Sequence, residues 1–379
     1  MSDDLSLFNM AHDIAVEQDG IGLDVSRVPR DIAVIALGEV PGVGHSTAVR
    51  LYDAKNFDSL FTGNRDEVQW IAGDAEVPSP HTFADTFLQH RDYALTQAFE
   101  EKRRFELNGV ELLLDSDKRY PERLRVLPDH PRWLFVRGDI DLLSSERLIT
   151  VVGTRQPTEL GSRLALRVTS TLVKQGFAIV SGLAEGIDAV AHRETVDNRG
   201  QTIAVLGTGI FNDFPATTTF LRGPIVQNGG AIITEFFPKE QYSRRRFVQR
   251  NRIQAALSNV TIPVEARLAS GTMHTIRFAR QYGRTVLGVK LAGTDDTELH
   301  AYLRETGSQV VEVPENDDPF LEAVARNYNY LNFARDSALT RRKVQITRVV
   351  RFARSVIKSE GLSDFEIAKM LERIKGGDE

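Results

Sequence analysis

A chain of 379 residues, of which 41% are hydrophobic and 26% charged, is long enough for one sizeable core and one or two smaller units. The absence of cysteine excludes disulfides, thiolate metal sites and cysteine nucleophiles. The formal net charge is −5 at pH 7, but bases dominate residues 244–252 and 341–358, so an anionic partner is compatible with this net charge.

The first residues, MSDDLSLFNMAHDIAVEQDG, carry acids where a signal peptide carries bases, and no later stretch approaches ~20 apolar residues. We therefore expect a cytoplasmic protein without a membrane span. Residues 1–108 are predicted to form a helical N-terminal domain of short helices.

The most informative part of this domain is residues 31–54, where an apolar helical pattern stops at Pro41-Gly42-Val43-Gly44 and then resumes. This predicts a helix-hairpin-helix-like element. Its glycines would let backbone amides approach a phosphate at the start of the second helix. The same turn is equally typical of two helices that only pack together, so both interpretations remain open.

Residues 73–108 are polar and carry few signals, and from residue 109 onward strand patterns alternate with helical patterns. The alternation predicts an α/β fold, with a Rossmann-like, mostly parallel, doubly wound sheet over residues 109–332. The predicted strands are 148–152, 177–180, 202–206, 231–234, 260–264 and 285–289. The predicted helices between them include 162–176, 187–198 and 270–283.

In such a sheet the ligand lies at the carboxyl ends of the strands. Here these ends carry small residues, namely Gly153-Thr154-Arg155, Ser181-Gly182, Gly207-Thr208-Gly209, Thr234-Glu235 and Ser270-Gly271-Thr272. Small residues let backbone amides and hydroxyls surround phosphate oxygens. A single turn of this kind is more often only structural, but five together indicate a phosphate-binding edge.

Neither the dinucleotide fingerprint nor a Walker A motif is present, and the sequence suggests no metal or cofactor. The titratable candidates at the strand ends are Glu185, Asp188, His192 and Glu265. Asp188 and His192 are four residues apart on one helical face, and we expect them to brace the turn before this helix. No catalytic residue is predicted.

The segment RRRFVQRNR, residues 244–252, has five arginines, and neither Asp nor Glu occurs from residue 241 to 264. Because a solvated helix face normally mixes both signs, this pattern favours phosphate binding by a polyanion. Arg250 and Arg252 are expected to project toward the strand ends from the start of a helix. Tyr242, Phe247 and Phe220 are candidate stacking surfaces for unpaired bases, although each is more often a core residue.

Residues 333–379 predict a helical C-terminal segment, possibly a truncated winged helix. Residues 341–358 place an apolar stripe on one helical face, and a second helix is expected from Ser363, with Glu366 at the spacing of a capping box.

Landmarks along the chain together resemble the DprA/Smf family of DNA-processing proteins, over roughly residues 115–290. They are YP at 120–121, LFVRGD at 134–139, VVGTR at 151–155, SGLAEGIDAVAH at 181–192, TIAVLGTGI at 202–210, GGAIITEFFP at 229–238, RNR at 250–252 and SGT at 270–272. Departures such as Phe214-Pro215, Thr218 and the extra Arg244-Arg245-Arg246 cluster mark a divergent member.

The resemblance implies a protein that binds single-stranded DNA in a basic pocket, forms a homodimer and passes the DNA to the RecA recombinase. Arg155 corresponds to the arginine of the family's first strand-end motif, and Arg250 and Arg252 to those of its RNR motif. Together with the residue-level reasoning, the predicted nucleic-acid-binding set is Gly153, Thr154, Arg155, Ser181, Gly182, Arg244, Arg245, Arg246, Arg250, Asn251, Arg252, Ser270, Gly271 and Thr272.

Two alternatives remain open. One is a DNA-sensing, antitoxin-like component of an anti-phage defence pair, with a defence protein rather than RecA as its partner. The other is a nucleotide-binding phosphoribohydrolase of the LOG type, although LASGTMHTI at 268–276 lacks the double glycine and the glutamate of that signature.

Overall fold

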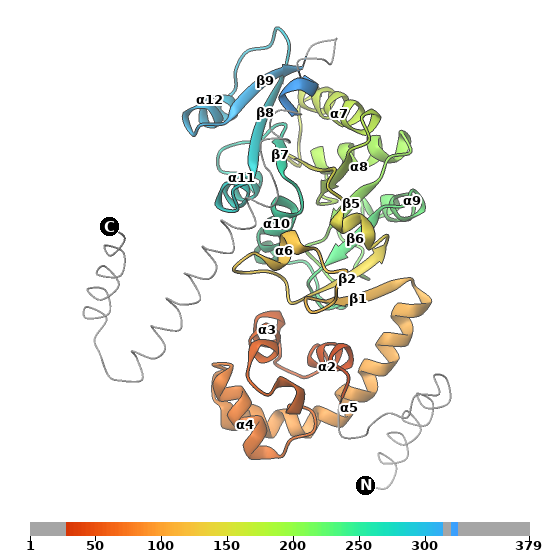
Figure 1. Ribbon diagram of the computed structural model, residues 1–379, viewed down its shortest axis with the longest axis vertical. Helices are drawn as coiled ribbons and strands as arrows, with labels where there is room; N and C mark the ends of the chain where they lie inside the picture. Colours follow the sequence, from red (N-terminus) through yellow and green to blue (C-terminus); the bar gives the residue numbers. More distant parts are fainter. Residues whose placement is uncertain (1–27, 314–319, 325–379) are drawn as a thin grey trace, which may run out of the picture. The chain divides into compact units, whose positions relative to one another are not determined.

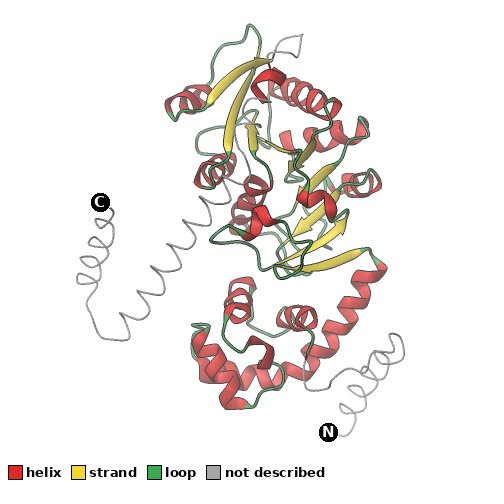
Figure 2. Ribbon diagram, in the orientation of Figure 1, coloured by secondary structure: helices red, strands yellow, loops and turns green. Residues whose placement is uncertain are grey.

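The computed structural model describes residues 28–313 and 320–324 (Figures 1 and 2). The chain forms two compact units, each assembled from segments that are separate in the sequence. The first unit takes its described residues from Met1–Arg119, Arg132–Leu143 and Gln201–Arg250. The second takes them from Tyr120–Pro131, Ser144–Gly200 and Asn251–Glu379.

The first unit begins with the helices α2 (Arg30–Leu37), α3 (His45–Asp53), α4 (Arg65–Asp74) and α5 (Pro80–Leu107), with a 3-10 turn at Phe57–Ser59. The predicted helix–turn–helix is confirmed. Gly42 adopts φ +82° in the turn, a left-handed conformation that favours glycine, and α3 begins three residues later.

The expectation of only short helices in this region is wrong, because α5 has 28 residues and covers most of the stretch that carried few signals. Its buried positions include three alanines, Ala84, Ala94 and Ala98. Alanine contributes little to a hydrophobic periodicity, so the apolar stripe of this helix is weak in the sequence although the helix is long.

The strands of the first unit are β1 (Val110–Leu114), β2 (Trp133–Gly138), β5 (Thr202–Val205) and β6 (Ala231–Thr234), and α9 (Arg222–Gln227) lies between β5 and β6 in the sequence. β1 pairs antiparallel with β2, β2 antiparallel with β6, and β5 parallel with β6. β1 and β2 were not among the predicted strands. They form an antiparallel pair outside the strand–helix alternation on which the prediction relied.

Aromatic side chains join the N-terminal helices to these strands. Phe105 of α5 contacts Phe135 at 5.5 Å between ring centroids, and His45 and Tyr52 of α3 contact Trp133 at 5.6 and 5.7 Å. Trp133 is fully buried, and its indole N–H donates to the Glu235 carbonyl at 2.9 Å. The helices therefore share a core with β2, next to the residue that follows β6.

The second unit contains the strands β3 (Leu148–Val152), β4 (Ala178–Ser181), β7 (Val260–Pro263), β8 (Thr285–Leu291) and β9 (Gln309–Val313). All of their pairings are parallel, with β3 between β4 and β7, and β8 between β7 and β9. Its helices are α6 (Glu122–Arg125), α7 (Glu159–Lys174), α8 (Ile187–Asp197), α11 (Thr272–Gln281), α12 (Glu298–Glu305) and the C-terminal part of α10 (Arg244–Leu257).

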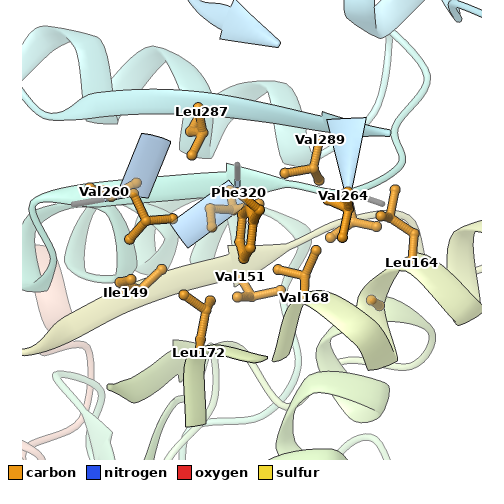
Figure 3. Close-up of a cluster of buried hydrophobic side chains, with 14 of the residues drawn as sticks. Ile149, Val151, Leu164, Val168, Leu172, Val260, Val264, Leu287, Val289 and Phe320 are labelled. Carbon is orange, nitrogen blue, oxygen red and sulfur yellow. The ribbon is translucent and has the colours of Figure 1, made fainter. Parts of the chain in front are cut away.

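Helices cover both faces of this sheet. On one face the core joins α7 and α8, which pack side by side in Figure 1, to β3, β7, β8 and Phe320, and its side chains are shown in Figure 3. On the other face, Val286 of β8 packs with side chains of α10, α11 and α12. Leu287, the next residue of the same strand, belongs to the first core, as expected when neighbouring side chains of a strand point to opposite faces.

The predicted α/β, Rossmann-like, mostly parallel and doubly wound fold is confirmed, and the six predicted strands lie within one or two residues of β3 to β8. β9 was not predicted. The helices expected in residues 333–379 lie outside the described residues, and the boundaries at 108 and 332 stay predictions. Within residues 28–313 and 320–324, no helix is both long and apolar enough to cross a membrane.

Candidate nucleic-acid interface

The turn after β3 contacts the start of α8 and the residue Glu265 that follows β7. A Cβ at Gly153 would lie 2.5 Å from Cγ1 of Ile187, so only glycine lets the start of α8 pack here. The Thr154 amide donates to the Glu265 carbonyl at 2.7 Å, and the Thr154 carbonyl accepts from the Ile187 amide at 3.1 Å. Arg155 follows this fixed backbone and is exposed.

The turn after β4 is held by buried polar side chains. The Gly182 amide donates to Asp188 Oδ2 at 3.2 Å, and the Leu183 amide donates to His192 Nε2 at 3.2 Å. The Ser181 hydroxyl donates to the Val151 carbonyl at 2.7 Å. The Ser181 hydroxyl and the Gly182 amide are therefore already bonded within the protein. Asp188 and His192 each accept from the backbone that they were expected to brace.

The same turn has an unusual backbone. Leu183 has φ +53°, which costs free energy for a residue with a side chain, and Gly186 has φ +76°. A Cβ at Gly186 would lie 2.3 Å from the Thr154 carbonyl oxygen, so the β3 and β4 turns approach each other through this glycine.

The N-terminus of α7 is occupied by a carboxylate of the protein. Glu265, just after β7, accepts from the Thr158 amide at 3.0 Å and from its hydroxyl at 3.0 Å, while the Thr158 hydroxyl accepts from the Gly161 amide. A Cβ at Gly161 would lie 1.7 Å from Glu265 Oε2. Since Glu265 already fills this position, the start of α7 is not open to a phosphate.

The N-terminus of α11 is different, because no side chain within the described ranges caps it. It follows Ser270 and Gly271, and the Ser270 Oγ is buried without a hydrogen-bond partner among the described residues. No atom lies within 4 Å of a Cβ placed on Gly271, which is exposed. The Met273 and His274 amides already donate to the Ser270 and Gly271 carbonyls at 3.2 and 3.1 Å, so this helix start offers the Gly271 and Thr272 amides and the buried Ser270 hydroxyl beside open space.

The middle of α10 is fixed beside this helix start. Asn251 is buried, and its Nδ2 donates to the Gly271 carbonyl at 3.2 Å. The buried Thr150 hydroxyl of β3 donates to the Gln254 carbonyl at 2.7 Å. At the C-terminus of α10, guanidinium groups donate to two helix carbonyls, from Arg123 to Leu257 at 2.9 Å and from Arg284 to Ala256 at 3.4 Å.

The RNR arginines, which were expected to bind phosphate at the strand ends, are buried. Arg250 and Arg252 are 3% and 6% exposed. The Arg252 guanidinium lies 3.6 Å from Asp129, and that of Arg250 lies 5.4 Å from the centre of the Phe247 ring. No acid lies near Arg252 in the sequence, but Asp129, about 120 residues away in the chain, lies beside it in the structure. The expectation that the run has no acid nearby is therefore wrong for Arg252.

Arg244, Arg245 and Arg246 form the first turn of α10, without an acidic residue in that turn. Arg246 pairs with Glu240, a residue just before the stretch that lacks acids, and burial lowers the pKa of its guanidinium. Arg244 and Arg245 are exposed. Among the described residues, neither forms a hydrogen bond or an ion pair.

The turn after β5, in the first unit, is closely packed. A Cβ at Gly207 would lie 2.6 Å from the Phe247 ring, and one at Gly209 would lie 2.2 Å from the Pro238 carbonyl oxygen. Phe247 is a core residue, only 7% exposed, whereas Tyr242 and Phe220 are 43% and 55% exposed. Of the three aromatic candidates, these two present ring surface.

The sequence reasoning missed the bonds of Glu265 to Thr158, the N-cap of α7, and the pairing of Asp129 with Arg252. Both depend on residues distant in the chain, and a single sequence carries no signal for them. It also missed His45, whose Nε2 lies 3.3 Å from Glu235 Oε2 in the interior of the first unit.

The family described as DNA recombination-mediator protein A matches residues 111–315. Protein Smf of Synechocystis sp. is 33% identical over 287 residues, which are 73% of this chain and 69% of that protein. DNA processing protein DprA of Bacillus subtilis is 34% identical over 181 residues, which are 48% of this chain and 61% of that protein, so this match spans less than two thirds of the relative.

Two solved structures are similar. The X-ray structure of DNA processing protein A from Streptococcus pneumoniae has a TM-score of 0.57 and 25% identity, covering 74% of this chain and 94% of that chain. DNA processing protein A from Helicobacter pylori, whose structure concerns its single-stranded DNA binding mode, has a TM-score of 0.51 and 26% identity, covering 58% and 97%. The matched region exceeds half of the sequence, and this chain belongs to the DNA recombination-mediator protein A family, the DprA/Smf family of DNA-processing proteins.

Proposed function

We propose that this protein binds single-stranded DNA through its phosphate backbone at the strand ends of the second unit, and that it acts in DNA processing or recombination mediation. The observation that carries the proposal is the uncapped start of α11, where the Ser270 hydroxyl is buried without a described partner next to the open position at Gly271. A phosphate oxygen would satisfy this hydroxyl and the Thr272 amide, which is the first of the helix.

Charge on the same edge supports a backbone ligand. Arg155 follows the β3 turn, and Arg267 lies in the loop between β7 and α11, where its carbonyl accepts from the Ser270 amide at 2.9 Å. Both side chains are exposed, so both can reach an anion in solvent. Arginines of this kind neutralise phosphates irrespective of base sequence.

We propose no reaction for this site. Asp188, His192 and Glu265 each accept hydrogen bonds from backbone amides, which is the work of structural side chains. A general acid or base must instead be within reach of the group whose proton it transfers. The two carboxylates and the imidazole thus support the turns that would hold the DNA.

The partner proteins are part of the same proposal. We propose that the chain forms a homodimer in the cytoplasm and passes bound DNA to RecA, as its family membership suggests. Co-sedimentation of the protein with RecA on single-stranded DNA measures this. DNA binding without any association with RecA would contradict the RecA part and direct attention to a defence protein as the partner.

Titration of labelled single- and double-stranded oligonucleotides at two salt concentrations tests the DNA-binding proposal. We expect tighter binding to the single strand and a strong loss of affinity at the higher salt concentration. Replacing Gly271→Ala places a methyl group in the open space, so we expect about tenfold weaker binding with little change in stability. Gly73→Ala, at an exposed position on α4 that is equally open, is the matched control.

A further inference from the structure

The first unit contains a cavity of about 310 Å³ that the proposed DNA site does not use. One wall is the N-terminal end of α3, from Gly44 to Thr47. The other is formed by Ser243, Arg245, Arg246 and Gln249 at the start of α10, together with Phe236. The residues of these walls include two arginines, a histidine and several hydroxyl groups, and none is acidic.

The α3 end of this cavity has the polarity that favours an anion. Gly44 is the N-cap, no side chain within the described ranges caps the helix, and its first turn contains no acidic residue. The Thr47 amide donates to the Gly44 carbonyl at 2.9 Å, so the first-turn amides without an acceptor in the helix are those of His45 and Ser46, where the helix dipole places positive charge. A Cβ at Gly44 would have no atom within 4 Å, so this helix end is open.

The second observation is a buried nitrogen of His45, a residue that lines the cavity. His45 is 8% exposed, and its Nδ1 is buried without a hydrogen-bond partner among the described residues. Its Nε2 faces Glu235 at 3.3 Å. A buried polar atom without a partner costs free energy. Because Nε2 faces a carboxylate, a phosphate oxygen would accept from Nδ1 of the ring that carries protons on both nitrogens.

The third observation concerns the first turn of α10. Arg244, Arg245 and Arg246 stand at the positive end of the helix dipole, where a cation is unfavourable. Glu240 neutralises Arg246, but Arg245 makes no hydrogen bond or ion pair with a described residue. A bound anion in the cavity would offset this cost.

We infer that this cavity is a second phosphate site, which holds one backbone phosphate of bound single-stranded DNA between the start of α3 and Arg245. The inference rests on the proposed function, and it assigns a role both to the Pro41–Gly44 turn and to the arginine cluster. It makes α3 a DNA-contacting element as well as a packing element.

Two single-charge variants provide the first test. Arg103→Ala and Arg245→Ala each remove one arginine from an exposed helical position of the first unit, but only Arg245 lines the cavity. We expect Arg245→Ala to weaken single-stranded DNA binding by roughly tenfold and to make the log–log salt slope less negative by about 0.7, whereas Arg103→Ala retains both values. Equal effects of the two variants would overturn the inference.

A second pair of variants tests the α3 end. Asp and Asn both cap a helix well, and Gly44 has ordinary extended angles that either residue adopts. Gly44→Asp places a carboxylate where the phosphate would bind, as Glu265 does at α7. We expect weaker DNA binding for Gly44→Asp than for Gly44→Asn, with both proteins at least as stable as the original. Equal DNA affinities would contradict the inference.

Inorganic phosphate separates the possible sources of the anion. We expect it to compete with DNA only weakly, because a free ion lacks the neighbouring contacts of a strand. If Arg245→Ala abolishes stabilisation by inorganic phosphate but leaves DNA affinity unchanged, the DNA assignment is overturned. If the original protein does not bind DNA, the proposed function itself is wrong. If it binds DNA but the paired variants have equal affinities, only the second phosphate site is wrong.

Discussion

At the residue scale, two glycines near helix starts of the second unit differ in their surroundings. At Gly161 a side chain would collide with Glu265, so glycine permits a contact within the protein. At Gly271 a side chain would meet nothing, so packing does not explain why glycine stands there. The sequence shows both as glycines near helix starts, and only the neighbouring atoms separate the structural one from the candidate ligand-binding one.

Replacing Gly161→Ala should destabilise the protein. The new Cβ would displace Glu265, whose carboxylate would lose its bonds to the Thr158 amide and hydroxyl, at a cost of about 1–3 kcal/mol. Urea unfolding measures the change. Gly73→Ala is the control, since it should stabilise α4 by about 0.5–1 kcal/mol. An unchanged urea midpoint for Gly161→Ala would show that displacing Glu265 does not lower the stability of the protein.

The buried arginines should also behave as structural residues. Replacing Arg252→Ala removes the partner of Asp129 and leaves a cavity, so we expect a loss of about 1–3 kcal/mol of stability. Replacing Arg155→Ala at an exposed position should change stability by less than about 0.5 kcal/mol and weaken DNA binding instead. Chemical denaturation of both variants decides this, and a stable Arg252→Ala protein would contradict a structural role.

At the scale of elements, α12 is tied to β8 by His300. Its Nδ1 accepts from the Thr297 amide at 3.0 Å, and its Nε2 bonds to the Val289 carbonyl at 3.1 Å. Burial is the main cause that lowers the pKa of His300 below its ordinary value of 6.5. Both bonds use the neutral ring, so protonation must break one of them.

This lowered pKa predicts a pH dependence of stability. Below pH 6.5 the unfolded chain takes up a proton at His300 before the folded protein does. The contribution of His300 is therefore complete above pH 6.5 and decreases as the pH falls toward the folded-state pKa. NMR titration, with His300→Gln to assign the signal, should give a folded-state pKa below 6.5. A value above 6.5 would contradict the account.

Elements with a strong repeating pattern could be predicted from the sequence, and those with a weak one could not. β3 to β8 are apolar and β-branched, each lies next to a clear helical segment, and their positions were accurate. The length of α5 was not predicted, because alanines occupy part of its buried face. β1 and β2 were not predicted, because they form an antiparallel pair outside the alternation of strands and helices. In the candidate site, the glycine turns were visible, but the burial of Arg250 and Arg252 depends on tertiary contacts.

At the scale of the whole molecule, the N-terminal helices share a unit with β1, β2, β5 and β6. The predicted boundary at residue 108 separates helices from strands, yet Phe105 and Tyr52 lie against Phe135 and Trp133, which are almost fully buried. We expect a fragment that begins at residue 109 to expose these rings and to melt at a lower temperature than the full chain. A fragment with an unchanged Tm would show that the strands fold without the helices.

The central claim is that this protein holds single-stranded DNA by its phosphates, and the salt dependence of binding tests it most directly. The measurement is the affinity of the full chain for a labelled oligonucleotide across a series of salt concentrations. Each neutralised phosphate contributes roughly −0.7 to the log–log slope, so several contacts predict a steep negative slope. A slope near zero would contradict the account.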